Sequence, residues 1–210
     1  MFQYIMVPIL YKLAASPPAC AVRMVAHIIG LKLDYKEPDI TKMEHKSPEY
    51  LKLNPLGTIP VLVDDDFILS DSHAIMIYLL SKYGGAHSER LYPSDIRTRA
   101  IVNQLPTIME GMKAPPEKHL RDLEEAYGMV EAYASKYKYI AADHLTIADL
   151  SLAMTMGAAQ VLHKLDHKKF PNTLNWLGLV EKEPYFIQIG LPGIAKFNKA
   201  MQYYTARNNQ

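Results

Sequence analysis

The chain has 210 residues, of which 49% are apolar and 21% are charged, a composition typical of a globular protein with a substantial core. Its formal net charge of +1 gives no electrostatic reason to expect a nucleic acid or an acidic partner. The single cysteine, Cys20, excludes an intrachain disulfide and is typical of proteins from a reducing compartment.

The start of the chain does not favour a targeting or membrane segment. Its longest apolar stretch, residues 4–11, is too short to span a bilayer and is interrupted by Pro8. Residues 1–3 lack the basic start of a signal peptide, although the alanines between residues 14 and 19 resemble a cleavage site. We therefore expect a cytoplasmic protein with no membrane span.

The first predicted unit is a strand, a helix and a second strand. Residues 9–13 form an apolar run that predicts a buried strand. The helix begins at Pro17, because a proline in the first turn loses no hydrogen bond, and ends at Gly30, a common C-terminal stop. Residues 33–36 predict the second strand, which we expect to run parallel to the first.

The next unit is a hairpin followed by a helix. Residues 60–63 and 67–69 flank three consecutive aspartates, a pattern that indicates a hairpin. Residues 70–72 offer capping side chains for a helix that runs to Tyr83. The order strand–helix–strand, strand–strand–helix is the thioredoxin-like arrangement, here over residues 1–83.

Residues 84–92 read as a linker, and residues 93–210 show only helical patterns. One helix starts at Ser94 and must break by the tandem prolines of residues 114–116. The other predicted helices cover residues 117–137 and 147–162 and the segments after Pro171 and Pro192. The fold class is therefore α/β followed by all-α.

Ser16 stands where the first strand ends and the first helix begins. As N-cap, its hydroxyl would accept from a backbone N–H, and since Pro18 has none, Ala19 is the remaining donor. The hydroxyl hydrogen is then free to donate outward near the positive end of the helix dipole, where it would favour a thiolate over a thiol. On this segment alone a plain capping serine is favoured, and the later motifs reverse that preference.

Asp71 and Ser72 begin the helix that ends at Tyr83. A ligand carboxylate can bind the N–H and hydroxyl of Ser72 at a helix N-terminus, while Asp71 pairs with an adjacent ammonium. The pair would thus bind an α-amino acid head. Without other motifs, a simple capping pair explains these residues equally well.

Four segments together resemble the glutathione transferases, specifically the insect delta and epsilon type. They are Ser16-Pro17-Pro18, the run Asn54-Pro55-Leu56-Gly57-Thr58-Ile59-Pro60-Val61-Leu62, Asp71-Ser72-His73-Ala74-Ile75, and the run from Leu145 to Ser151. The resemblance covers nearly the whole chain. It implies a thioredoxin-like glutathione-binding domain over residues 1–83, a linker over 84–92 and a helical domain over 93–210 that forms a hydrophobic substrate pocket.

The resemblance also implies roles for single residues. Ser16 would be the catalytic residue that hydrogen-bonds the glutathione sulfur. The Ile59-Pro60 bond would be cis, and the Ile59 backbone would pair with the cysteinyl residue as a strand does. The implied glutathione-binding residues are His45, Ile59, Asp71, Ser72 and His73. Taken alone, an ordinary trans proline and a solvated loop histidine remain open at Pro60 and His45.

The function that the resemblance implies is conjugation of reduced glutathione, as co-substrate, to hydrophobic electrophiles in detoxification, by a homodimer. We expect no tightly bound cofactor and no metal, because the histidines form no HExxH pattern. One alternative is a weakly catalytic or non-catalytic carrier of hydrophobic ligands. Another is an interaction module of a translation or synthetase assembly, which would normally accompany extra domains.

Three positions depart from the family pattern. Cys20 stands where the family often has arginine, which puts in doubt a charged contact that helps to order the site. Gly57 stands where related sequences often carry a second histidine, and nothing in the sequence replaces it. We therefore expect weaker glutathione binding, and we expect Gly57→His to tighten it if the loop tolerates the new side chain. Asp71 is shorter than the usual glutamate.

The remaining features predict structure more than chemistry. The segment Thr146 to Asp149 fits a capping box, with aspartate in place of the usual glutamate. Cys20 is predicted to be an inert or semi-buried thiol, because the nucleophilic cysteine of omega-type relatives corresponds to position 16. Met109 and Met112 could line a substrate pocket, but a place in the core is favoured.

Overall fold

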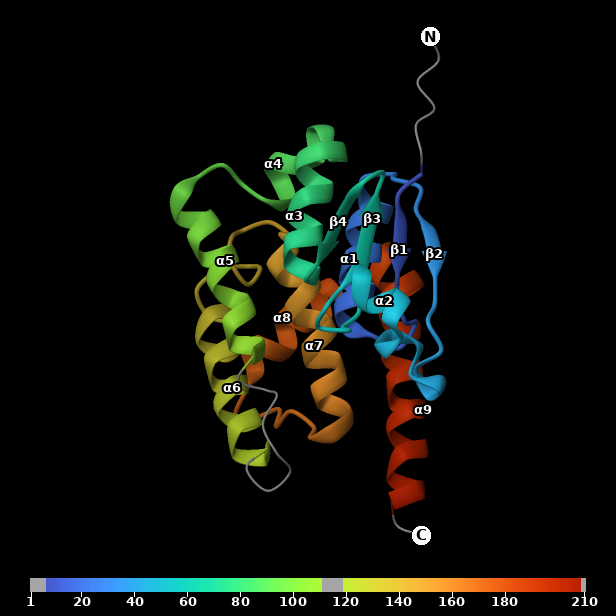
Figure 1. Ribbon diagram of the computed structural model, residues 1–210. Helices are drawn as coiled ribbons and strands as arrows, with labels where there is room; N and C mark the ends of the chain where they lie inside the picture. The colour runs from blue at the N-terminus through green and yellow to red at the C-terminus, as the bar shows by residue number, and fades with distance from the viewer. Residues whose placement is uncertain (1–6, 111–118, 209–210) are drawn as a thin grey trace.

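The computed structural model describes residues 7–110 and 119–208, and its amino-terminal part contains a four-stranded sheet (Figure 1). The strands are β1 (Ile9–Tyr11), β2 (Asp34–Lys36), β3 (Val61–Asp64) and β4 (Phe67–Ser70). The sheet order is β2-β1-β3-β4, with β1 parallel to β2 and the other pairs antiparallel. The predicted parallel pair and the predicted hairpin are confirmed.

Helices cover both faces of this sheet. They are α1 (Pro17–Ile28), α2 (Pro48–Leu53) and α3 (Ser72–Tyr83), with short 3-10 turns η1 (Ile40–Lys42) and η2 (Glu44–Lys46) before α2. In Figure 1, α2 lies in front of the strands and α1 behind them. The α1 and α3 helices contact each other, and α1 also packs on α7 of the carboxyl-terminal part.

The ends of α1 agree with the sequence. Ser16 is its N-cap, and prolines occupy its first turn. At the other end Gly30 has a φ of +68°, with hydrogen bonds from the Gly30 N–H to the His27 carbonyl (3.1 Å) and from the Leu31 N–H to the Ala26 carbonyl (2.9 Å). This pair of bonds is the Schellman motif, so a glycine is needed where the chain leaves the helix.

The regular elements in the described carboxyl-terminal part are all helices. Its elements are η3 (Gly85–His87), α4 (Ser88–Leu91), α5 (Ile96–Glu110), α6 (His119–Ala134), α7 (Ile147–Leu162), α8 (Pro171–Val180), a π-helical turn (Phe186–Gly190) and α9 (Leu191–Asn208). The bounds predicted for α7 are confirmed, and α6 ends three residues earlier than predicted. The predicted break at residues 114–116 and the side chains of Met109 and Met112 lie outside the described part.

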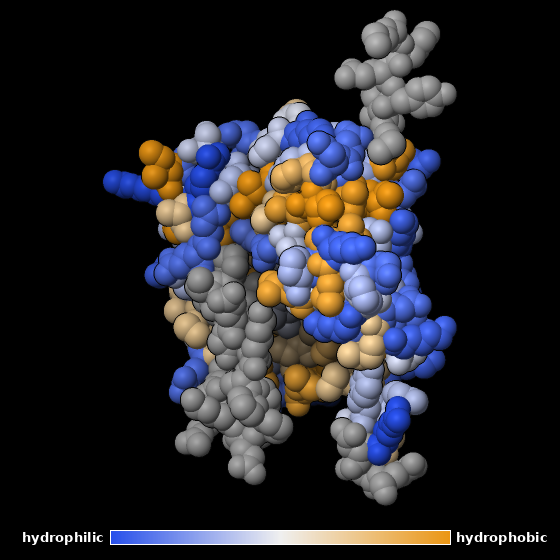
Figure 2. Space-filling model, viewed as in Figure 1, coloured by the Kyte–Doolittle hydropathy of each residue, from blue (hydrophilic) through white to orange (hydrophobic). Residues whose placement is uncertain are grey.

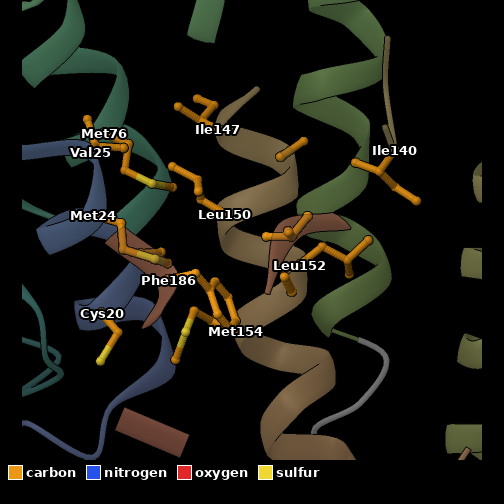
Figure 3. Close-up of a cluster of buried hydrophobic side chains, with 14 of the residues drawn as sticks. Cys20, Met24, Val25, Met76, Ile140, Ile147, Leu150, Leu152, Met154 and Phe186 are labelled. Carbon is orange, nitrogen blue, oxygen red and sulfur yellow. The ribbon is translucent and has the colours of Figure 1, made fainter. Parts of the chain in front are cut away.

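Both parts of the chain share one hydrophobic core, and α7 runs through its centre. This helix contacts α1, α3, α5, α8 and α9. Figure 3 shows Met24 of α1 and Leu150 and Met154 of α7 gathered with Phe186 of the π-helical turn, and all four side chains are fully buried. The position of α1 therefore depends on packing against the carboxyl-terminal helices as well as on the sheet.

A buried carboxylate fixes the start of α7. Asp149 is completely buried, and its Oδ2 accepts from the Thr146 N–H (2.8 Å) and hydroxyl (2.9 Å). Its Oδ1 accepts from the Ile140 N–H (2.8 Å) and from Nε1 of Trp176 on α8 (2.8 Å). The predicted capping box is present. The carboxylate also joins α7 to α8 and to the segment before it.

Asp149→Asn should destabilise the protein strongly. The asparagine amide replaces one carboxylate oxygen with an NH2 group, which cannot accept the hydrogen bonds that this oxygen now receives. Buried donors would therefore lose their partner. We expect a loss of about 3 kcal/mol in the free energy of unfolding. Urea unfolding followed by the fluorescence of the single tryptophan measures it. The exposed Asp143→Asn is the matched control, and an equal loss in both variants would contradict this role.

A second buried carboxylate holds α3 on the hairpin. Asp64 at the end of β3 is only 2% exposed, and its carboxylate accepts from the hydroxyls of Tyr78 (2.8 Å) and Tyr83 (2.7 Å) and from Nζ of Lys82 (2.8 Å). Burial acts to raise the pKa of Asp64, but the hydrogen bonds from Lys82, Tyr83 and Tyr78 outweigh it and hold the pKa below its usual value.

The contribution of Asp64 should depend on pH. Because the pKa is lower in the folded than in the unfolded chain, the charged carboxylate stabilises the fold above the unfolded pKa of about 4 and loses this effect as the pH falls through the folded value. The difference in unfolding free energy between the native protein and Asp64→Asn should therefore be constant near neutrality and shrink below about pH 4. Urea titrations at several pH values test this, and a difference independent of pH would contradict it.

Candidate functional site

The candidate site is organised by one row of paired residues across the sheet. Tyr11, the last residue of β1, is paired with Lys36 of β2 and with Val61 of β3. Val61 is in turn paired with Ser70, the last residue of β4. We call Lys36, Tyr11, Val61 and Ser70 the strand-end row. All four strands enter or leave the sheet at this row, so the adjoining segments emerge at the same end of the strands.

The residues predicted for the site lie in those segments. Ser16 follows β1, Ile59 precedes β3, and Asp71 follows β4 directly. His45 lies in η2, in the connection that follows β2. The sheet thus brings together residues that are up to 55 positions apart, as the chain runs from Ser16 to Asp71. The sequence predicted these residues from separate motifs, and the strand register brings their segments to the same end of the strands.

Ser16 has the geometry of a capping serine with a free donor. Its φ of −84° and ψ of 113° are those of an N-cap, and its Oγ accepts from the Ala19 N–H at 3.4 Å, which is a long hydrogen bond. Within the described residues the hydroxyl donates to no acceptor. The side chain is half-buried. The hydroxyl hydrogen can therefore be directed to a ligand at the helix N-terminus.

The segment before β3 lies at the same end of the strands and has a free backbone. The Ile59-Pro60 peptide bond is cis, as the resemblance implied. Among the described residues, no hydrogen bond involves the backbone N–H or C=O of Ile59. An extended peptide could pair with both groups in the manner of an added strand.

Asp71 and Ser72 form the start of α3 in an unusual backbone conformation. Asp71 is the N-cap and has a φ of +83°, a left-handed value that costs a non-glycine residue roughly 1–3 kcal/mol. Its Oδ1 accepts from the Ala74 N–H at 2.9 Å, while the other carboxylate oxygen accepts no hydrogen bond from the described residues. Ser72 is the first residue of the helix. Backbone strain of this kind is concentrated at binding and catalytic sites.

Two histidines at the site carry buried nitrogen atoms without partners. These atoms are Nδ1 of His45 and both ring nitrogens of His73. Burial lowers the pKa of His73 more than the neighbouring Asp71 carboxylate raises it, so the imidazole is neutral at pH 7. An unpaired buried polar group costs about 1–3 kcal/mol, and a polar ligand at this edge would supply the missing partners.

The backbone at Gly57 does not meet the condition set for Gly57→His, which was a loop that tolerates a side chain. Its φ of +59° is left-handed, and a Cβ built there would lie 2.7 Å from the carbonyl oxygen of His45 and 2.7 Å from Nζ of Lys46. A histidine at this position would be strained and would displace the Lys46 side chain, so Gly57→His does not simply restore a contact. No sequence motif indicated Lys46 as a residue of this loop that contacts Gly57. Its Nζ donates to the Leu56 carbonyl at 2.8 Å.

Cys20 lies one turn inside α1 and is fully buried, as expected for an inert thiol. Its Sγ is 3.6 Å from the Ala14 carbonyl, and Nη1 of Arg23 donates to it at 3.9 Å. Burial raises the pKa of the thiol, although Arg23 acts in the opposite direction. Arg23 thus places a cation one helical turn from Cys20, the position where the family often has arginine. No sequence motif indicated Arg23 as part of the site.

A cavity of about 510 Å³ lies beside α2 and is lined in part by Tyr50, Leu53 and two residues of the strand-end row, Tyr11 and Lys36. None of the predicted site residues lines it. Among the described residues, no group of three or more His, Cys, Asp or Glu side chains could hold a metal ion. None of the helices in residues 7–110 and 119–208 is long and apolar enough to cross a membrane.

Comparisons with known proteins agree with this fold. The family model for the glutathione S-transferase N-terminal domain matches residues 10–87, and that for the C-terminal domain matches residues 62–184. Glutathione S-transferase D7 of Anopheles gambiae is 35% identical over 189 residues, which cover 82% of this chain and 85% of the relative.

Two solved structures are also similar over nearly the whole chain. An epsilon-class glutathione S-transferase from the housefly Musca domestica superposes with a TM-score of 0.87 at 31% identity, over 93% of this chain and 97% of the other. A glutathione transferase homolog from Drosophila mojavensis with bound glutathione gives a TM-score of 0.85 at 34% identity, over 93% and 96%.

The fold and the strand-end row define a thioredoxin-like domain joined to a helical domain, with its candidate site at the carboxyl-terminal end of β1. The chain belongs to the glutathione S-transferase family and is a glutathione transferase of the insect delta/epsilon type.

Proposed function

We propose that the protein conjugates reduced glutathione to hydrophobic electrophiles, with Ser16 as the catalytic residue. The observation that carries this proposal is the convergence of Ser16, Ile59 and Asp71 at the strand-end row. Together they offer a hydroxyl donor, a free backbone edge and a site for an α-amino acid. Glutathione has a group for each: a thiol, an extended peptide and a γ-glutamyl head.

In the proposed reaction, the Ser16 hydroxyl donates to the sulfur and favours the thiolate. The glutathione thiol loses its proton to solvent, and the thiolate attacks an electrophilic carbon. A carbon–sulfur bond forms while the bond to the leaving group breaks, so thiol and halide, for example, give thioether and acid. The enzyme contributes a lower thiol pKa and proximity of the two reactants. This step requires no metal or tightly bound cofactor.

The other site residues would hold the peptide in register. Ile59 would pair with the cysteinyl residue through its backbone N–H and C=O, and Ser72 and Asp71 would bind the carboxylate and ammonium of the γ-glutamyl head. His45 would contact the glycyl end, and His73 lies beside Ser72. The buried, unpartnered nitrogens of both histidines support a polar ligand here.

The electrophile would lie between the two parts of the chain. Figure 2 shows a recess below α2 whose floor is coloured as hydrophobic. An apolar substrate in this position would be next to a thiol held at the N-terminus of α1. We also propose that this reaction takes place in the cytoplasm and serves detoxification, in keeping with a chain whose single cysteine can form no intrachain disulfide.

Ser16→Ala should raise the pH at which the bound thiolate forms and reduce turnover. Glutathione affinity should change less, because Ile59, Asp71 and Ser72 still hold the peptide. Lost capping should cost about 1 kcal/mol of stability. The measurement is the rate of conjugation of a chlorinated nitrobenzene against pH, with melting temperatures alongside.

Ser47→Ala is the matched control for capping. Ser47 is the N-cap of α2, precedes a proline in the same way, and accepts from the Tyr50 N–H at 3.2 Å. It should lose stability without a shift of the pH profile. If Ser16→Ala leaves the profile and the turnover unchanged, the catalytic role of Ser16 is wrong, and the carrier of hydrophobic ligands becomes the better explanation.

We further propose a homodimer in which the start of the second domain packs on the partner's first domain. Phe67 and Ile68 on β4 and Ile96 at the start of α5 are exposed apolar side chains, with Ile96 83% exposed, and an interface of this kind would bury them. Light scattering at micromolar concentration should give twice the chain mass of 23.8 kDa. A single-chain mass would refute the dimer.

A further inference from the structure

The Lys46 side chain occupies the space that a side chain at position 57 would fill. A Cβ on Gly57 would lie 2.7 Å from Nζ and 2.8 Å from Cδ of Lys46. Both contacts are closer than atoms can approach without a shift. The lysine therefore lies across the glycine, and its ammonium stands at the place that the family usually gives to a histidine.

The ammonium of Lys46 has donors to spare. It donates one hydrogen bond, to the Leu56 carbonyl at 2.8 Å, and it forms no ion pair within the described residues. A lysine ammonium has three N–H donors, so two remain for a ligand. Next to it, Nδ1 of His45 is buried without a partner. A negatively charged group between these two side chains would meet the remaining donors of the exposed Lys46 ammonium and the unpartnered His45 nitrogen.

The loop under Lys46 is held firmly by a buried side chain. Asn54 is 1% exposed, its Oδ1 accepts from the Leu56 N–H at 3.1 Å, and its Nδ2 donates to the Thr58 carbonyl at 3.0 Å. The Tyr50 hydroxyl donates to the same carbonyl at 2.9 Å. The carbonyl that fixes the Lys46 ammonium is thus part of a well-defined loop, which positions the charge before a ligand binds.

The strand order determines which end of glutathione lies near this charge. β4 and β2 are the two outer strands of the sheet. Asp71, which follows β4, and η2, which follows β2, therefore lie at opposite ends of the strand-end row, and Ile59, which precedes β3, lies between them. With the γ-glutamyl head at Asp71 and the cysteinyl residue at Ile59, the third residue of the peptide is directed toward η2. Its carboxylate then lies on the side of Lys46.

We propose that Lys46 is the residue that binds the glycyl carboxylate of glutathione, in place of the side chain that Gly57 lacks. This inference rests on the proposed function. It differs from the sequence-based expectation that nothing replaces the histidine. Lysine and glycine form a matched pair, because Lys46 can lie across position 57 only while that position has no side chain.

The test combines two ligands with three variants in calorimetric titrations. The ligands are glutathione and its C-terminal amide, which lacks only the glycyl charge. The variants are Lys46→Met, Lys46→Arg and, as matched control, Lys52→Met, which removes an exposed lysine from the neighbouring helix α2. Melting temperatures show whether each variant is folded.

The native protein should bind the amide about tenfold more weakly than glutathione, the scale of one hydrogen bond to a charged group. Lys46→Met should bind glutathione about tenfold more weakly and should no longer distinguish the two ligands. Lys46→Arg should retain most of the preference, and Lys52→Met should behave as the native protein.

Two results would overturn the inference while leaving the proposed function intact. In one, the native protein binds glutathione but does not prefer it to the amide. In the other, Lys46→Met keeps the full preference. A native protein that binds neither ligand would instead refute the proposed function, and the inference with it.

Discussion

The buried carboxylate of Asp149 is the interaction on which the arrangement of the two parts depends. It accepts four hydrogen bonds, one of them from Trp176 on α8, and it caps α7. Because α7 packs directly on α1, the start of α7 affects the position of the helix that Ser16 caps. Asp149, which lies outside the candidate site, therefore helps to place Ser16, the proposed catalytic residue, through rigid packing of buried side chains.

The sheet performs the second part of this positioning. Its strands are only three or four residues long, so they bury little surface alone, and Leu10 and Leu62 reach the core only because helices cover them. What the sheet provides is register. The segments with Ser16, Ile59 and Asp71 lie one to five residues from the strand-end row, whereas His45 lies nine residues after Lys36. Short loops from a rigid sheet allow little freedom, which suits the extended peptide of the proposed function.

Local features of the sequence predicted much of this structure. The N-cap at Ser16, the stop at Gly30 and the bounds of α7 follow from nearest-neighbour rules, because the groups that satisfy each other are within a few residues. The two hydrogen bonds that Asp149 accepts from Thr146 follow in the same way. The other two, from Ile140 and Trp176, come from distant segments, and no local pattern indicates them.

The same distinction applies at the site. The family pattern considers Cys20 and Gly57 one position at a time, as places where a usual side chain is missing. The structure places Arg23 one helical turn from the first position and lays Lys46 across the second. A ligand responds to the location of a charge in space, and a flexible lysine or arginine side chain can bring that charge from a neighbouring position. At Gly57 the absence of a side chain is what lets Lys46 lie there, so the two residues have to be considered as one unit.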